Sequence, residues 1–520
     1  MLRRKTKGPK AIAGSEPRQA AAASRNIIII GGGIAGLACG SYLQMNGYKT
    51  EILEANTVPG GLCAAWDRGP YVFDGCLRWL VGTHPSSAFH RIWSELGALA
   101  GRKIVDHDEF LRIEGLDGQV LSLSSDLDQL ARDCKRIAPE DSALVDNLVR
   151  AARRCAPLDP PEKPLELMSG LEKMKLLVRC FPMLLTIARW KNREFGAYLA
   201  ACRNPFLREA LIAVAGDARM SALALVMVLG WRSRKNAGYV AGGSRAFAQA
   251  MAGRYARLGG VLRYETQVAS VLVENDRATG LRCADGRVVP ASTVVSCADG
   301  RTTIFNLLEG RYVGKRIRCA YNQWEVFPGL FQASLGVNRI FPEAPRAVNL
   351  PLSPPLKVDG ATKHDRLEAA FFGSDSGLCP AGKTIIIVRF SGRYEHWADL
   401  RQHQPADYAQ AKQRLLQEII GILDRRFERV ARHLEQADLA TPATFARFTG
   451  NWQGSIQGWL PTPAILGRRL PRTLPGLKDF YMAGHWVEPG GGLPSAALSG
   501  KYVAQMICAR DGKVFAATEP

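Results

Sequence analysis

The sequence contains no run of about 18 consecutive apolar residues, the length that a membrane-spanning helix requires. Its two most apolar stretches, residues 176–188 and 222–231, are shorter than this, and the first is interrupted by Arg179 and Pro182. We therefore expect no spanning helix. Burial inside the protein is the favoured interpretation of both stretches, and an element that dips into a membrane surface is the alternative.

Paired cysteines are also lacking. The 12 cysteines are scattered without a C-x-x-C spacing, which argues against the common zinc sites and against a disulfide framework. We predict no metal site and a reducing, cytoplasmic environment. The serines and cysteines form no nucleophile-elbow motif, so the sequence does not indicate catalysis through an acyl-enzyme.

Acidic residues are the minority charge, with 48 Asp and Glu against 68 Lys and Arg and a net charge of +20. Residues 1–25 are strongly basic and have no apolar core of signal-peptide length, so we expect a disordered leader there. Because basic groups beside an apolar stretch favour anionic lipid, we predict peripheral attachment to a membrane. No basic groove interleaved with aromatic residues is visible, so nucleic acid is not an expected partner.

Glycine is the residue type in excess, with 51 residues in the chain, and it is clustered. The first cluster follows a β-branched run at residues 26–30 and precedes residues with helical apolar spacing at 34–45, and a second strand is expected at 49–54. This βαβ pattern with G-x-G-x-x-G is typical of a dinucleotide site, in which the helix N-terminus faces a pyrophosphate. The residues predicted to line it are Gly31, Gly33, Ile34, Ala35 and Gly36.

An acid follows at the spacing that such a site requires. Glu54 lies 21 positions after Gly33, at the end of the second predicted strand, where a carboxylate can accept hydrogen bonds from the ribose of an adenosine. A negative charge there also argues against a 2′-phosphorylated nucleotide. The glycine pair that follows is not a general requirement of simple NAD dehydrogenases, so it favours a flavin. The predicted cofactor contacts of this segment are Glu54, Ala55, Gly60, Gly61 and Leu62.

The other end of the chain repeats the pattern of strand, glycine-rich loop and helix. Residues 480–484 read FYMAG, and GGGLPSAA at 490–497 starts the expected final helix. Backbone N–H groups at such a helix start stabilise the negative charge that a reduced flavin carries at its pyrimidine edge. We predict cofactor contacts at Gly484, His485, Gly491, Gly492 and Leu493.

Together with residues 242–299, these segments resemble the phytoene desaturase, carotenoid isomerase and retinol saturase family of FAD-dependent enzymes. The resemblance covers residues 26–508 and implies an FAD cofactor, with Val268 beside the adenine and Ser296 close to the cofactor. Many relatives carry an aspartate where this chain has His485, which puts the usual contact to the ribityl chain in doubt. His485 and Glu488 are the candidate catalytic residues, and holding the loop is the alternative role for both.

The predicted fold is an α/β fold with a Rossmann-like FAD-binding domain, an interleaved α+β substrate domain and a helical cap. We assign residues 26–105, 236–301 and 441–515 to the FAD-binding domain, and residues 106–235 and 302–440 to the substrate and cap domain. The predicted activity is desaturation, saturation or isomerisation at the carbon–carbon bonds of a long apolar, isoprenoid-like substrate. The alternatives are an amine or small-molecule flavin oxidase and a non-catalytic prenyl-lipid escort protein.

Overall fold

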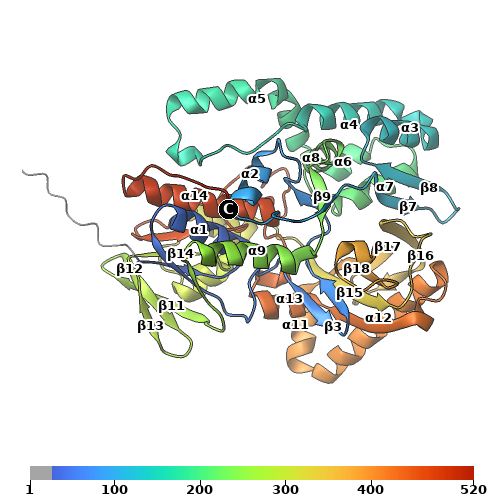
Figure 1. The fold of residues 1–520 in the computed structure, drawn as a ribbon. Helices are drawn as coiled ribbons and strands as arrows, with labels where there is room; N and C mark the ends of the chain where they lie inside the picture. The colour runs from blue at the N-terminus through green and yellow to red at the C-terminus, as the bar shows by residue number, and fades with distance from the viewer. Residues whose placement is uncertain (1–25) are drawn as a thin grey trace, which may run out of the picture.

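The computed structural model describes residues 26–520, so the predicted leader at residues 1–25 lies outside the described residues. A parallel sheet of five strands occupies one half of the molecule (Figure 1). Its strand order is β10 (Val261–Arg263), β2 (Lys49–Leu53), β1 (Asn26–Ile30), β14 (Thr293–Ser296) and β20 (Phe480–Met482). Three distant parts of the chain therefore build one sheet.

Both faces of this sheet are covered, as its apolar strands require. Ile27 and Ile29 of β1 belong to a core shared with α1 (Ile34–Met45), α9 (Gly243–Arg257) and α14 (Gly492–Arg510). Ile28 and Ile30 point the other way, into a core shared with the antiparallel strands. These are β11 (Val268–Glu274), β12 (Arg277–Cys283) and β13 (Val288–Pro290).

The predicted βαβ unit is confirmed, because β1, α1 and β2 begin at the expected residues and end within one residue of them. Asp285 and Gly286 lie in the turn that joins β12 and β13.

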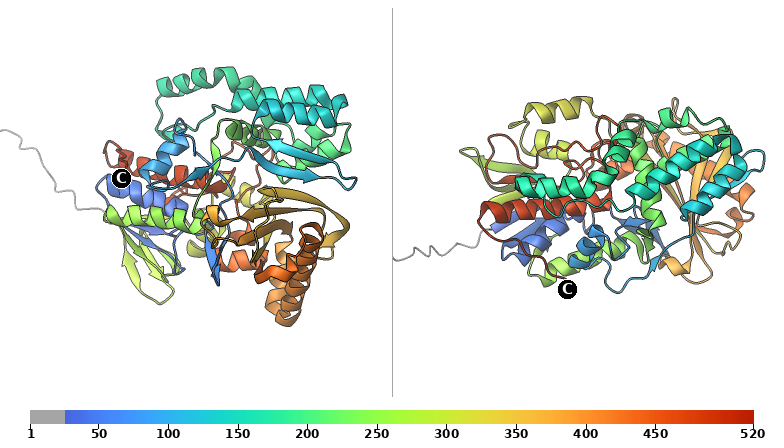
Figure 2. Two further views of the ribbon diagram at one scale, coloured as in Figure 1. Left: turned by 45° about the vertical axis from the view of Figure 1, so that its right-hand side comes forward. Right: turned by 90° about the horizontal axis from the view of Figure 1, so that it is seen from above.

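The second half of the molecule is built on a seven-stranded sheet, which lies beside the parallel sheet (Figures 1 and 2). Its neighbours are antiparallel except for β16 and β7. Helices α11 (Tyr394–His403) and α12 (Pro405–Arg426) pack on one face of it. The order is β19 (Leu434–Ala440), β15 (Gly329–Val337), β18 (Thr384–Gly392), β17 (Lys363–Phe372), β16 (Ala347–Lys357), β7 (Glu109–Glu114) and β8 (Val120–Ser124).

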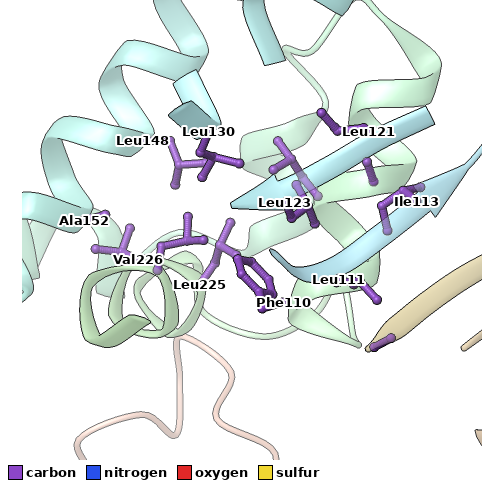
Figure 3. Close-up of a cluster of buried hydrophobic side chains, with 14 of the residues drawn as sticks. Phe110, Leu111, Ile113, Leu121, Leu123, Leu130, Leu148, Ala152, Leu225 and Val226 are labelled. Carbon is purple, nitrogen blue, oxygen red and sulfur yellow. The ribbon is translucent and has the colours of Figure 1, made fainter. Parts of the chain in front are cut away.

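A helical cap packs against the other face of the seven-stranded sheet. Figure 3 shows how Leu111 and Leu123 of the strands meet Leu148, Ala152 and Val226 of the helices in one apolar core. The cap helices are α3 (Leu127–Ile137), α4 (Ser142–Cys155), α6 (Phe195–Leu199), α7 (Pro205–Ala215) and α8 (Ala222–Ser233). Burial was expected for residues 222–231, and α8 is indeed largely buried.

Burial was wrong for the other apolar stretch. Residues 176–188 lie in α5 (Gly170–Lys191), a long helix at the edge of the molecule in which only Thr186 and Trp190 are buried. Pro182 stands inside this helix and does not end it. The periodicity shows an apolar stripe, but it does not show whether another element covers that stripe. None of the helices within residues 26–520 is long and apolar enough to cross a bilayer.

Smaller elements connect these layers. A hairpin of β3 (Ala65–Arg68) and β4 (Tyr71–Asp74) follows β2 in the chain, and β4 contacts β18 of the seven-stranded sheet. The remaining elements are β5 (Leu80–Val81), α2 (Ala88–Glu95), β6 (Ile104–Val105), β9 (Ala237–Val240), α10 (Lys315–Gln323) and α13 (Pro442–Thr449).

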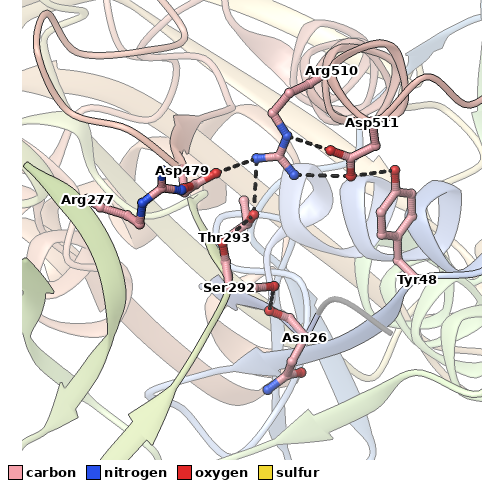
Figure 4. Close-up of polar contacts among 8 residues, drawn as sticks. All are labelled: Asn26, Tyr48, Arg277, Ser292, Thr293, Asp479, Arg510 and Asp511. Atoms are coloured by element: carbon pink, nitrogen blue, oxygen red, sulfur yellow. Dashed lines mark hydrogen bonds and ion pairs between the residues drawn. The ribbon is translucent and has the colours of Figure 1, made fainter. Parts of the chain in front are cut away.

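The last helix is tied to the amino ends of the central strands by a polar network (Figure 4). Arg510 donates to Asp479 at 2.9 Å and to Thr293 at 3.2 Å, and it also pairs with Asp511. The hydroxyl of Tyr48 donates to Asp511 at 3.0 Å. This network fixes α14 against β14 and β20, at the opposite end of the sheet from the glycine-rich loops.

The architecture is therefore an α/β fold with a Rossmann-like half, a mixed sheet and a helical cap. The parallel sheet draws on residues 26–53, 261–296 and 480–482, and the seven-stranded sheet draws on 109–124 and 329–440. The exact domain boundaries stay a prediction.

Candidate functional site

The loop between β1 and α1 has the close packing that its glycines suggest. Gly31 has a φ of +95°, and its N–H donates to the carbonyl of Leu53 at 2.8 Å. A Cβ on Gly36 would lie only 2.0 Å from the carbonyl oxygen of Gly31. Only glycine therefore lets α1 start directly against the loop. The helix starts at Ile34 with Gly33 as its N-cap, and no side chain caps its free N–H groups.

Glu54 stands at the end of β2 beside this helix start. Its side chain is 5% exposed, and Oε2 accepts a hydrogen bond from the N–H of Gly32 at 2.6 Å. Oε1 accepts from the N–H of Asn56 at 2.9 Å. Oε1 also accepts from the side-chain amide of Asn56 at 2.9 Å, whereas Oε2 keeps a second lone pair that can accept a hydroxyl from a ribose. Ala55 lies between Glu54 and Asn56 in the sequence.

The second glycine pair lies directly against the first loop. The N–H of Gly60 donates to the carbonyl of Gly32 at 2.9 Å, and Gly60 has a φ of +118°. A Cβ on Gly60 would lie 2.4 Å from the carbonyl oxygen of Cys63. Leu62, which follows the pair, is partly buried. The predicted contacts 31–36 and 60–62 thus form one surface, although they are separated in sequence.

The carboxyl-terminal loop joins the same surface. The N–H of Gly484 donates to the hydroxyl of Ser499 at 3.0 Å, and a Cβ on Gly484 would lie 3.7 Å from that of Ala35. Where α14 crosses α1, a Cβ on Gly500 would lie 2.5 Å from the carbonyl oxygen of Ala35. The helix begins at Gly492, eight residues or roughly 12 Å before this crossing. Gly491 is the N-cap of this helix, and Leu493 is its second residue. The first N–H groups of α14 also lack a side-chain cap.

Val268 and Ser296 are placed next to these loops by backbone pairing. The N–H of Thr266, two residues before Val268, donates to the carbonyl of Glu54 at 2.8 Å. Ser296 ends β14, its carbonyl accepts the N–H of Ala483 at 2.9 Å, and its hydroxyl lies 2.7 Å from that of Thr303. Both residues are buried.

His485 is held in one orientation by Asn451. Its Nε2 lies 3.2 Å from Asn451 Oδ1, and the indole N–H of Trp486 donates to the same oxygen at 3.0 Å. Because that oxygen accepts, Nε2 must carry a proton and Nδ1 keeps its lone pair in the neutral ring. Removal from water lowers the pKa of His485 to about 4, so the ring is neutral at pH 7. A Cβ on Gly458 would lie 2.6 Å from this ring.

Glu488 forms ion pairs with two arginines. One of its carboxylate oxygens pairs with Arg472, and the other lies 3.0 Å from Nε of Arg469. Arg472 also binds Glu166, just before α5, at 2.8 Å. This buried ion-pair cluster favours a structural role that ties the last loop to the cap. Proton transfer by Glu488 stays a prediction, and the geometry does not support it.

Two cavities beside the seven-stranded sheet have no counterpart in the sequence-based predictions. The larger has a volume of about 530 Å³ and lies between Gly61, Leu62 and the edge of the seven-stranded sheet, with Trp66, Phe445 and Phe448 among its walls. The smaller, of about 220 Å³, lies between the cap and the face of that sheet. The residues that line each cavity come from distant segments, so no local motif announces them.

The paired glycine loops fit an extended dinucleotide that carries a flavin. The starts of α1 and α14 both have N–H groups without a side-chain cap, and the buried carboxylate of Glu54 accepts a hydrogen bond from the loop at the first of them. Side chains at Gly36 and Gly60 would collide with backbone in these loops. A family model described as flavin containing amine oxidoreductase matches residues 34–508.

The chain belongs to this family. As a member of the flavin-containing amine oxidoreductase family it is an FAD-dependent oxidoreductase, which confirms the cofactor predicted from the glycine motifs. No group of three or more His, Cys, Asp or Glu side chains in residues 26–520 is arranged to hold a metal ion.

Full-length relatives confirm the resemblance that the sequence suggested. A lycopene-forming phytoene desaturase of Paracoccus sp. is 25% identical over 93% of this chain and 97% of its own length. A 4,4′-diapolycopene oxygenase of Methylomonas sp. is also 25% identical, over 94% of this chain and 98% of its own. A chloroplastic prolycopene isomerase of Arabidopsis thaliana is 23% identical over 93% and 83%.

Solved flavoprotein structures share the fold of this family member. Cyclohexylamine oxidase from Brevibacterium oxydans superimposes with a TM-score of 0.59 at 15% identity, covering 94% of this chain and 100% of its own. Putrescine oxidase bound to putrescine gives a TM-score of 0.58 at 13% identity, with coverage of 94% and 99%. At this level of identity the likeness concerns the fold alone.

Proposed function

We propose that the enzyme acts on carbon–carbon bonds of a long apolar, isoprenoid-like substrate by desaturation, saturation or isomerisation. The observation that carries the proposal is the full-length similarity to a phytoene desaturase, a diapolycopene oxygenase and a prolycopene isomerase. The names of these relatives describe different reactions but one kind of substrate, a long polyene. The substrate class is therefore better supported than the reaction type.

The chain's own residues suit the tasks of binding and orientation. We propose that Glu54 accepts the ribose hydroxyls of the adenosine and that the α1 helix start binds the pyrophosphate. The N–H groups of Gly492 and Leu493 would stabilise negative charge at the pyrimidine edge. Bound FAD supplies the acceptor or donor of a hydride, while the protein holds the reacting carbon in place and excludes water. His485 Nδ1 is an acceptor for a ribityl hydroxyl.

The larger cavity is a candidate for the apolar part of the substrate. It starts at the flavin-side residues Gly61 and Leu62 and is walled mainly by apolar groups. Its one carboxylate, Asp438, is already bound by Arg68 at 2.8 Å and by the indole of Trp66 at 3.0 Å. The cavity is also lined by Arg68, Arg401, Lys412 and Arg447, and this surplus of positive charge argues against a cationic amine substrate.

Helix α5 supports the proposed membrane attachment. Leu171, Met174, Val178, Phe181 and Leu185 follow the spacing of one helix face, and their exposed fractions range from 57% to 85%. Basic residues flank this stripe, namely Lys173, Lys175, Arg179, Arg189 and Lys191. An exposed apolar stripe with basic neighbours is the pattern of a helix that lies in a lipid interface. Such a helix would bring the enzyme to a lipid-soluble substrate.

The decisive experiment is anaerobic incubation of the purified yellow enzyme with carotenoids, retinoids and shorter isoprenoids. We expect at least one polyene to bleach the flavin absorbance, or to isomerise without net bleaching. Ala440→Phe fills the larger cavity and should lose this response with full flavin content. Val120→Phe, at an exposed edge of the same sheet, should keep it. A panel without any response, but with bleaching by an amine, would contradict the proposal.

The same preparation separates the enzyme from a lipid escort protein. An escort would purify without flavin absorbance and would still bind prenyl lipid. Flavin retained at one equivalent per chain supports the enzyme.

A further inference from the structure

The smaller cavity combines strong positive charge with aromatic walls. It is enclosed by α8, β9 and the face of the seven-stranded sheet at β16 and β17. Three arginines line it, Arg78, Arg232 and Arg346, together with His107. Glu368 is the only carboxylate among the lining residues. Its volume of about 220 Å³ corresponds to roughly seven waters, enough for an end group and a few carbons.

Only one of the three arginines is neutralised within the cavity. Arg78 pairs with Glu368. Arg232 and Arg346 form no ion pair with any carboxylate in residues 26–520, and the Nε of Arg232 and an Nη of Arg346 are buried without a hydrogen-bond partner. Nε2 of His107 is likewise buried without a partner. Buried charges and donors without acceptors are costly, and an anion bound between these groups would offset that cost.

The aromatic contacts hold these guanidinium groups in place without neutralising them. Arg232 lies 4.3 Å from the ring centre of Phe110, and Arg346 lies 3.6 Å from that of Phe372. Burial, with the neighbouring Arg78, lowers the pKa of Arg232 to about 10. Burial also lowers that of Arg346 to about 10. Both therefore stay charged at pH 7, and a planar anion with two oxygens matches their paired donors.

One short segment of the chain contributes to both cavities. Gly75 lines the larger apolar cavity, and Arg78 and Trp79, a few residues later, line the smaller one. Trp79 and Phe110 would contact the carbon chain of a group bound between the arginines.

We propose that this cavity binds the carboxylate of an apolar acid, so that the substrate is an isoprenoid-like chain with an acidic end group. This inference deepens the proposed function and rests on it, because it names the end of the substrate that the enzyme recognises. Arg232 and Arg346 bind the two carboxylate oxygens, and the aromatic walls take the first carbons of the chain.

Matched retinoids test the proposal on the holoenzyme. Retinoic acid and retinol share one isoprenoid chain and differ in the end group, and their binding is measured by quenching of tryptophan fluorescence. We expect retinoic acid to bind about 10-fold to 100-fold more tightly than retinol, as charge-assisted hydrogen bonds allow. Arg232→Gln and Arg346→Gln should each remove most of that preference. Arg112→Gln, which breaks a partly exposed pair with Glu109, should keep it.

Equal affinity of the native enzyme for acid and alcohol would overturn the proposal, as would binding of inorganic phosphate without any binding of retinoic acid. If a variant fails to fold, melting temperatures of the native enzyme decide, because retinoic acid should raise them and retinol should not. A clear preference for the acid, without a flavin response to any isoprenoid, would support this site and contradict the proposed function.

Discussion

Glu54 is the residue whose role is the most direct to test. Replacing it by alanine removes the partner of the Gly32 N–H and the acceptor that we propose for the adenosine ribose. We expect Glu54→Ala to purify with much less flavin, because a buried N–H is left unpaired and a ribose contact is lost. The measurement is the ratio of flavin to protein absorbance. Glu51→Ala on the same strand breaks only a partly exposed pair with Arg263 and should keep the flavin. Full flavin content in both variants would remove Glu54 from the site.

His485 predicts a dependence of stability on pH. The unfolded chain protonates this residue near pH 6.5, whereas the folded protein resists protonation until pH about 4. Between these values the unfolded state binds more protons, so the contribution of His485 destabilises the folded protein increasingly as pH falls from 6.5 to 4. Above pH 6.5 the effect is absent.

Thermal unfolding of the native enzyme and of His485→Gln checks this sign. The loss of melting temperature between pH 7 and pH 5 should be smaller in the variant, which cannot take up that proton. Identical pH profiles would mean that His485 is not shielded as described. Flavin retention at pH 7 should fall in His485→Ala, because the acceptor at Nδ1 is missing.

Individual glycines were predictable because their constraint is local. The spacing of Gly31, Gly36 and Glu54 reports a turn, a close contact and a strand end that lie within one βαβ unit. The partner that orients His485 was not predictable, because Asn451 lies 34 positions away and reaches the ring only through the fold. The same holds for Arg78, Arg232 and Arg346, which meet only when cap and sheet pack together.

At the scale of elements, α5 predicts binding to lipid surfaces. The double variant Phe181→Ser, Leu185→Ser removes the two most exposed apolar side chains of the stripe, at 72% and 85% exposure. We expect an unchanged melting temperature and a marked loss of co-sedimentation with vesicles of phosphatidylserine and phosphatidylcholine at low salt. Added salt should also weaken binding of the native enzyme.

Leu116→Ser is the matched control, since that side chain is 75% exposed in the turn between β7 and β8. It should bind vesicles like the native enzyme. If the native enzyme ignores the vesicles, and the α5 variant instead turns a dimer into a monomer, the stripe serves contact between two copies of the chain.

The crossing of α1 and α14 predicts a contrast between two helical glycines. In Gly500→Ala the new methyl group would lie 2.5 Å from the carbonyl oxygen of Ala35, so the helices must separate. We expect a loss of about 1–3 kcal/mol in unfolding free energy and weaker flavin retention. Gly421→Ala in α12 meets nothing closer than 3.5 Å and should be neutral or stabilising by up to about 1 kcal/mol. Equal effects of both substitutions would contradict the tight crossing.

Elements with a strong local period were the ones that sequence could predict. Strands β1 and β2 and helix α1 were expected from a β-branched run, from helical apolar spacing and from the glycines between them. Strand β12 was not predicted, because its residues alternate only weakly between apolar and polar. Whether α5 is covered depends on the packing of α4 and α8 elsewhere, and no pattern within the helix contains that information.

At the scale of the whole molecule, FAD should act as a clamp between chain segments that are far apart in sequence. Removing it leaves the glycine loops with unpaired N–H groups, so the apoprotein should melt several degrees lower than the holoenzyme. At a thousandfold excess over its dissociation constant, a ligand adds about 4 kcal/mol of stability. Added FAD should restore the melting temperature, and FMN, which lacks the adenosine that Glu54 would bind, should restore little. No difference between the two flavins would contradict the assignment of the adenosine side.

The parallel sheet described above has a consequence for how the protein is made. β1 ends at Ile30 and β20 begins at Phe480, so at roughly 5–20 residues per second their synthesis is separated by about 20 to 90 seconds. During that interval β14 has no strand on its outer side, and α1 lacks the helix that it packs against most extensively. A nascent chain on the ribosome therefore presents an apolar sheet edge until its last segment emerges. Chaperone binding at this stage, and loss of yield when the carboxyl-terminal helix is shortened, follow from the order in which the sheet is completed.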